Sequence, residues 1–266
     1  MIAERRDGQC CTICLNMSPE NVASTEPQPA GMSELSRIAG VFFEPSKTFR
    51  DIAQRPTWLV PMILIVLASL GFAYTLSQRV GWERVIQQQN EAASSRLQQM
   101  SPEQREQGLA MQRKILPVSF FGGALLAPPM MSVVVAAVLL GMTALMSAGL
   151  RFKNVFAAVA WAGLPRMLSA ILTIVVLFLK NPDEFNLRNP LAFNLGAFMD
   201  PNGGSKFVYA LATSLDLFSI WNMLLLATGL KAAAGKKLTF TGALVAVLVP
   251  WGILTLCGAA FAAAFS

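Results

Sequence analysis

The chain has 266 residues, of which 54% are apolar and only 14% are charged, with a net charge of +6 and no histidine. A soluble globular domain usually carries about 25% charged residues, so this composition indicates a protein that lies in lipid rather than in water. The lack of histidine removes the commonest general base and metal ligand, and no basic stripe with interleaved aromatic residues indicates a nucleic-acid partner.

Residues 1–31 are rich in Pro, Glu, Ser, Asn and Gln and show no periodicity, which predicts a disordered tail. No apolar run follows Arg5-Arg6, so we expect no secretory signal there. Met32 opens a well-patterned segment and is an alternative start, in which case the tail is not translated.

A cysteine cluster lies within this tail, at Cys10, Cys11 and Cys14. Three thiols hold a metal ion only with a fourth ligand from elsewhere in the chain or from another copy. We therefore predict neither a metal site nor a cofactor. Cys257 lies within an apolar stretch and is most simply a small hydrophobic residue.

Residues 32–57 form the next segment, in which apolar residues recur at helical spacing and Ser33 is placed to cap a helix. Pro45 ends this helix, and a shorter helix that carries Phe49 follows it. The pattern suits an amphipathic helix in the membrane surface, and equally a helix packed on the protein's own spans. The apolar positions are Leu35, Ile38, Ala39, Phe42 and Phe43.

Five later stretches are apolar and long enough to cross a bilayer core, which needs roughly 20 helical residues. The sequence thus predicts an all-α fold, a polytopic membrane helical bundle with five transmembrane helices plus the N-terminal amphipathic helix, the membrane domain covering residues 58–266. In the second stretch, Pro128-Pro129 predicts a kink, unless that helix begins near Ala127. The five stretches are Trp58–Leu76, Pro117–Leu150, Val155–Leu179, Phe207–Leu230 and Phe240–Phe265.

Residues 77–116 separate the first two stretches and are polar, with many Gln and Arg. Ser101-Pro102-Glu103-Gln104 has the pattern of a helix start: a capping hydroxyl, proline at the first position and Gln three residues after the cap. We predict a polar helical hairpin outside the membrane.

The basic residues of the short loops predict the orientation of the chain. With the N-terminus in the cytoplasm, two compact loops that contain Arg151, Lys153, Lys231, Lys236 and Lys237 lie on the inner side. Six basic residues within 77–116 then lie outside, against the rule. The balance favours a cytoplasmic N-terminus and an external C-terminus.

Two charges lie within apolar stretches. Asp216 falls near the middle of Phe207–Leu230, and Arg166 follows Pro165 in Val155–Leu179. If the two helices are antiparallel neighbours, Arg166 lies about 16 Å and Asp216 about 21 Å from the inner end, at roughly 1.5 Å per residue. We predict an intramembrane ion pair between them. In the alternative, residues 153–163 form an interfacial helix and Arg166 meets lipid headgroups.

No enzyme motif is found. The chain has no Gly-x-Ser-x-Gly, no Walker-type phosphate loop and no pair of carboxylates at a useful spacing. We predict a protein that is not an enzyme.

Two strings of residues stand out in the chain. One runs from Phe43 to Phe49 and is followed by Arg55-Pro56-Thr57-Trp58, and the other is Asp216-Leu217-Phe218-Ser219-Ile220-Trp221 with the residues up to Gly229-Leu230. In these strings, and over about residues 34–262, the chain resembles the Yip domain family, the Ypt/Rab-interacting five-span membrane proteins. The family-like positions are Pro45, Phe49, Pro56, Trp58, Asp216, Phe218, Trp221 and Gly229.

This resemblance implies an all-helical integral membrane protein with a cytoplasmic N-terminus. Eukaryotic members are associated with Rab-type GTPases, but the sequence is more similar to the prokaryotic branch. The resemblance therefore implies a bacterial inner membrane and does not imply Rab binding.

We expect a scaffold or adaptor in membrane organisation or trafficking, in contact with the lipid bilayer and with an unidentified protein partner. That partner would meet either the N-terminal amphipathic region or the hairpin at 77–116. The alternative is a transporter or channel-like component that uses Asp216 in a polar path. The sequence does not indicate an oligomeric state.

Overall fold

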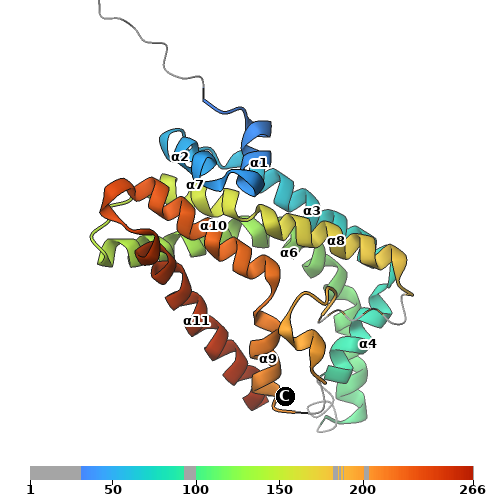
Figure 1. Ribbon diagram of the computed structural model, residues 1–266. Helices are drawn as coiled ribbons and strands as arrows, with labels where there is room; N and C mark the ends of the chain where they lie inside the picture. The colour runs from blue at the N-terminus through green and yellow to red at the C-terminus, as the bar shows by residue number, and fades with distance from the viewer. Residues whose placement is uncertain are drawn as a thin grey trace, which may run out of the picture. The chain divides into compact units, whose positions relative to one another are not determined.

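The computed structural model describes residues 31–92, 100–181, 185, 187, 189–200 and 204–265. These residues form helices and no named strand (Figure 1). Five helical segments are long and apolar enough to cross a membrane, so the predicted all-α, five-span bundle is confirmed. The tail up to residue 30, with its cysteine cluster and its predicted disorder, lies outside the described residues.

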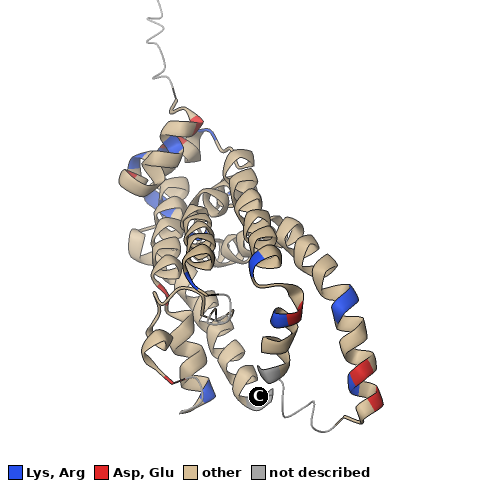
Figure 2. Cartoon of the chain, turned by 90° about the vertical axis from the view of Figure 1, so that its right-hand side faces the viewer, with Lys and Arg blue, Asp and Glu red and all other residues tan. Residues whose placement is uncertain are grey.

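The first, third and fifth spans lie close to their predicted positions. The first is α3 (Leu59–Arg79), and the fifth is α11 (Phe240–Phe265). The third consists of α7 (Phe152–Ala162) and α8 (Leu164–Leu179), which meet at Gly163. Long stretches of these helices carry no charged residue, as Figure 2 shows.

The second span, α6 (Pro102–Leu145), is a single helix of 44 residues. It begins with the predicted capping box, in which Ser101 Oγ accepts from Gln104 N and Gln104 Oε1 accepts from Ser101 N. The alternative start near Ala127 is wrong, because the capping box starts the helix far upstream. The helix also ends earlier than Leu150, at a turn in which Ser147 and Gly149 adopt positive φ angles.

The helix assignment of α6 continues through Pro128 and Pro129. The hydroxyl of Ser132 also donates to the Pro128 carbonyl, one turn earlier in the helix. The kink predicted at these prolines stays a prediction.

The fourth span differs from the predicted stretch Phe207–Leu230. The chain forms α9 (Lys206–Ser214), breaks at Leu215, and then forms α10 (Leu217–Ala234), which a 3-10 turn, η3 (Gly235–Lys237), prolongs. The span is Leu217–Lys237. Hydropathy misplaced it because α9 is apolar enough to extend the run of the span toward the N-terminus.

The N-terminal segment forms α1 (Glu34–Phe43), capped by Ser33, and α2 (Pro45–Gln54), with Pro45 at its first position. The sequence predicted both the cap at Ser33 and the break between two helices at Pro45. The residues of α1 that are buried are Arg37, Gly40 and Val41, whereas the predicted apolar positions Leu35, Ala39 and Phe43 are exposed. A place for α1 in the membrane surface stays a prediction.

Helix α2 packs against α7 and α10, and α10 also packs against α8 and α11. The core lies where these helices meet. Every residue from Val155 to Ala162 is buried, so α7 is enclosed on all sides over more than two turns. Trp161, which is fully buried, donates its indole N–H to the carbonyl of Thr57 at 2.8 Å and ties α7 to the start of α3.

Between the first two spans, α4 (Trp82–Ala92) packs against the first part of α6. Arg113 pairs with Glu83 at 3.1 Å, and the side chains of Gln112 and Gln89 are hydrogen-bonded. The structure thus has two paired polar helices in the region of the predicted hairpin. Their position outside the membrane stays a prediction.

Candidate functional site

Asp216 is the N-cap of α10 and does not lie in the middle of a span. Its Oδ1 accepts from the backbone N–H groups of Phe218 at 2.9 Å and Ser219 at 3.0 Å. The first backbone N–H groups of a helix have no partner within the helix, and the helix dipole favours a negative charge there. A carboxylate at this position is therefore stabilised without any counter-ion.

The segment before α9 folds back over this helix start. Asn194, which precedes a short 3-10 helix, η2 (Leu195–Phe198), forms an antiparallel backbone bridge with Asp216. Leu217 N donates to Phe193 O at 3.1 Å, and the Phe193 ring packs edge-on against Phe218. These contacts hold the start of α10 in place.

Asn222 bridges α10 to the break between α7 and α8. The amide of residue 166 bonds the Gly163 carbonyl, so the carbonyl of Ala162 lacks the partner that a continuous helix would provide. The side-chain amide of buried Asn222 donates to that carbonyl.

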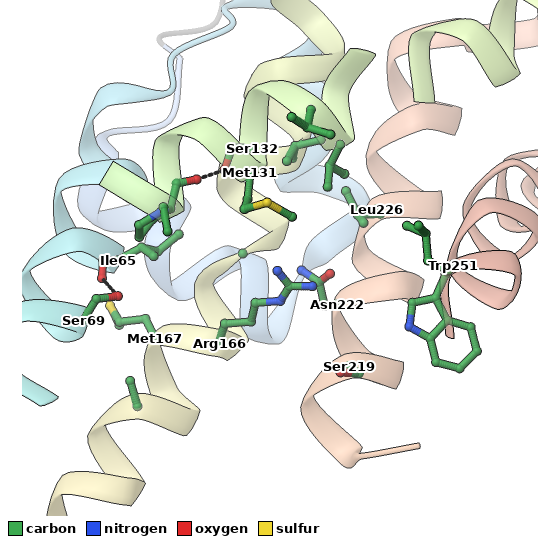
Figure 3. Close-up of a pocket in the computed structure, with 18 of the residues that line it drawn as sticks. Ile65, Ser69, Met131, Ser132, Arg166, Met167, Ser219, Asn222, Leu226 and Trp251 are labelled. Atoms are coloured by element: carbon green, nitrogen blue, oxygen red, sulfur yellow. Dashed lines mark hydrogen bonds between the residues drawn. The ribbon is translucent and has the colours of Figure 1, made fainter. Parts of the chain in front are cut away.

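A cavity of about 730 Å³ lies beside this break. Residues of α3, α6, α7, α8, α10 and α11 line it, and most are aliphatic or aromatic. Figure 3 shows a part of the lining in which the labelled side chains come from several helices. The polar lining residues are Ser69, Ser119, Ser132, Arg166, Ser219 and Asn222.

Arg166 lies in the first turn of α8 and reaches into this cavity, where its guanidinium and the Asn222 side chain point toward one another (Figure 3). Within the described part of the chain, no hydrogen bond or ion pair is found at the guanidinium. The third span covers Phe152–Leu179, so Arg166 lies near its middle. A charge within a span is costly and usually marks a functional position. The alternative, in which residues 153–163 form an interfacial helix and Arg166 meets lipid headgroups, stays a prediction.

The predicted ion pair joins Arg166 to Asp216. Among the described residues no direct pair is found between the two side chains. Asp216 does not line the cavity. A direct pairing stays a prediction.

The two family-like stretches meet in space. Gly229 of α10 faces Phe49 of α2 and Ala158 of α7, and a Cβ atom at Gly229 would lie 2.9 Å from the Cβ of Ala158 and 3.0 Å from the Cδ1 of Phe49. Only glycine allows the three helices to approach this closely. Sequence patterns singled out Phe49 and Gly229 separately but did not predict their contact.

The other family-like positions also support contacts between segments. Trp221 packs edge-on against Phe42 of α1, with ring centroids 5.4 Å apart, and Trp58 packs in the same way against Phe156 of α7. Phe218 is buried at the start of α10. Pro56 lies in the link from α2 to α3, and Pro45 begins α2. These contacts indicate roles in packing.

A buried polar network, which sequence reasoning missed, holds α1 against α2. Arg37 is only 2% exposed, and its guanidinium pairs with Asp51 at 2.7 Å and with Glu34 at 3.2 Å. It also donates to Thr57 Oγ1 at 2.7 Å and to the carbonyl of Arg55. The available signal was a cation close to the apolar face of a predicted amphipathic helix.

The described residues bring together no group of three His, Cys, Asp or Glu side chains that could hold a metal ion. Cys257 is exposed on α11. Neither the capped Asp216 nor the Arg37 network places a nucleophile beside a base, so both arrangements are suited to holding helices together.

The chain was compared with protein-family models, with curated proteins and with solved structures. The family model of the Yip1 domain matches residues 39–262, which is most of the chain and includes all five spans up to the last turn of α11. No curated protein and no solved structure matches the chain.

Proposed function

The chain belongs to the Yip1 domain family, and we propose that this multi-pass integral membrane protein is a non-enzymatic scaffold or adaptor in membrane organisation or trafficking. The observation that carries the proposal is the fixed position of the α1–α2 pair. The Arg37 network locks α1 to α2, and Phe49 locks α2 to α7 and α10. A rigid surface of this kind suits the binding of a partner protein, because little ordering entropy is lost on association.

The surface that α1 presents is apolar with basic neighbours. Leu35 is 79% exposed and Phe43 is 85% exposed, and Ala39 lies between them on the same helix face. Lys47 and Arg50 of α2 are exposed nearby in the sequence. Exposed apolar residues with a polar rim are typical of protein or membrane contacts. We propose a protein partner for this face, with lipid as the competing occupant.

The partner surface is tested by photo-crosslinking in native membranes, with a photoreactive residue at Ala39. We expect a discrete protein adduct whose yield falls on Phe43→Ser and is unchanged by Leu179→Ser, a matched change at the exposed end of α8. A photoreactive residue at exposed Met111 on α6 tests the hairpin as the contact site instead. If only lipid is captured at Ala39, this face is not a scaffold surface.

Transport along a polar path at Asp216 has less support. Asp216 caps α10 and is not among the residues that line the cavity, whose walls are mostly apolar.

We propose further that the protein lies in a bacterial inner membrane with its N-terminus in the cytoplasm and its C-terminus outside. The basic loops at Arg151 to Lys153 and Lys231 to Lys237 support this orientation.

A further inference from the structure

The cavity beside the α7–α8 break combines hydrocarbon walls with a cation. Its described lining residues include one charged side chain, Arg166, and the walls are built largely from aliphatic residues of α6 together with Trp251 of α11. Its volume of about 730 Å³ falls within the range of roughly 300–1,000 Å³ that is usual for sites of single small ligands.

The charge of Arg166 favours an anion in this cavity. An ionised group in an apolar environment carries a large desolvation cost unless a partner compensates it. Asp216, the acid that the sequence predicted to pair with Arg166, has Oδ1 engaged by two backbone N–H groups and does not line the cavity. The planar guanidinium matches a carboxylate with two parallel hydrogen bonds.

Three of the six polar lining residues, Arg166, Ser219 and Asn222, come from α8 and α10, whereas the hydroxyls of the other three donate to carbonyls of their own helices; these are Ser69, Ser119 and Ser132. Ser219 and Asn222 lie on successive turns of α10 and face the side on which Arg166 lies (Figure 3). The rest of the lining offers contacts for methylene groups. One charged head and one hydrocarbon tail are thus complementary to the two parts of the cavity.

We propose that this cavity binds a single-chain anionic amphiphile, a carboxylate with one long alkyl chain, whose carboxylate lies on Arg166 and whose chain runs between α6 and α11. The site is independent of the partner surface on α1, because the two share no residue. A phospholipid, a helix of a second copy and water are the competing occupants.

Palmitate is the probe. The full chain is placed in phosphatidylcholine nanodiscs at alkaline pH, and palmitate brominated on its chain is added to quench tryptophan fluorescence. We expect a saturable quenching component that is absent in Trp251→Phe, because Trp251 lines the cavity. Unlabelled palmitate displaces the brominated probe, and hexadecanol at equal concentration does not.

Two pairs of variants test where the carboxylate and the alkyl chain of palmitate bind. Arg166→Gln lowers the affinity for palmitate at least about tenfold, because the carboxylate loses its charged partner. Arg151→Gln, the same charge change outside the cavity, leaves the affinity unchanged. Gly123→Leu fills the cavity and weakens binding, whereas Gly122→Leu on the adjacent position does not, since only Gly123 lines the cavity.

The first side-chain atom of either glycine variant is accommodated, because a Cβ atom at either position meets nothing within 4 Å. The Gly123 test therefore holds even if Arg166→Gln fails to accumulate. The proposal is overturned if quenching does not saturate, if hexadecanol competes as well as palmitate, if anionic phospholipid alone displaces the probe, or if Gly123→Leu and Gly122→Leu bind palmitate equally.

Discussion

The ring of Phe49 lies directly against the backbone of Gly229, so that a Cβ atom at residue 229 would lie within 3.0 Å of the ring. This contact joins α2 to α10, and through Ala158 it also includes α7. It explains why a glycine occurs in the middle of a buried helix, where it otherwise costs about 1 kcal/mol relative to alanine.

Gly229→Ala is expected to lower the stability of the detergent-solubilised protein by about 1–3 kcal/mol, because the added methyl group overpacks the contact with Phe49 and Ala158. Gly252→Ala on α11 is the matched control, since a Cβ atom there meets nothing within 4 Å. The Phe49→Leu background should recover part of the loss. Equal melting temperatures for the two glycine variants would contradict the close contact.

Arg37→Met should destabilise the protein by about 3 kcal/mol, because Asp51 and Glu34 lose their cation. This magnitude lies at the low end of the range for buried ion pairs, because the Asp51 side chain is still 16% exposed. Arg50→Met, at an exposed position of α2, is the control and should change little. Denaturation monitored by tryptophan fluorescence measures both. Equal free energies of unfolding for the two variants would show that the Arg37 network does not stabilise the fold.

Asn222→Leu should cost about 1–3 kcal/mol, because the carbonyl of Ala162 is then buried without a donor. Thr228→Val serves as the comparison, since the Thr228 hydroxyl bonds only a carbonyl of its own helix. Hydrogen exchange of the backbone amides at the α7–α8 break should also become faster in Asn222→Leu. An unchanged exchange rate would argue against Asn222 as the group that holds this break.

Asp216→Ala should cost about 1 kcal/mol through loss of the helix cap, whereas Asp216→Asn keeps the capping oxygen and should retain most of the stability. The same two changes made in an Arg166→Gln background form a double-mutant cycle. A coupling energy above about 0.5 kcal/mol between Arg166 and Asp216 would support the predicted ion pair. A smaller value leaves the cap as the sufficient role of Asp216.

Alkaline phosphatase fused after Phe265 should be active in bacterial cells, and a fluorescent protein fused before Met32 should fluoresce, because the basic loops favour a cytoplasmic N-terminus and five spans place the ends on opposite sides. A phosphatase fusion within the loop at Lys236 should be inactive. The opposite pattern would reverse the proposed orientation.

The sequence predicted the spans wherever apolar length alone defines a helix, as for α3 and α11. It misplaced the fourth span because hydropathy treats Phe207–Leu230 as continuous. In the structure α9 ends at Ser214, and Asp216 is the N-cap of the next helix, α10. An aspartate before an apolar run is a helix-start signal, and here that signal outweighs the continuity of the apolar residues.

The candidate site was only partly accessible from sequence. Arg166 was identified because a charge in an apolar run stands out, but its cavity depends on how five spans pack. The bond from Asn222 to Ala162 joins residues 60 positions apart, and no local pattern encodes such a pairing. The Arg37 network was hidden because a cation in an amphipathic helix is normally assigned to its polar face.

The enclosure of α7 has a consequence for the order of assembly. Val155 to Ala162 are covered by protein on all sides, and part of that cover is α10, which the ribosome completes about 70 residues later. At roughly 5–20 residues per second, α7 waits roughly 4 to 14 s for its partner. During that interval α7 is held by lipid or by the insertion machinery, so its final packing is a step that follows the synthesis of the fourth span.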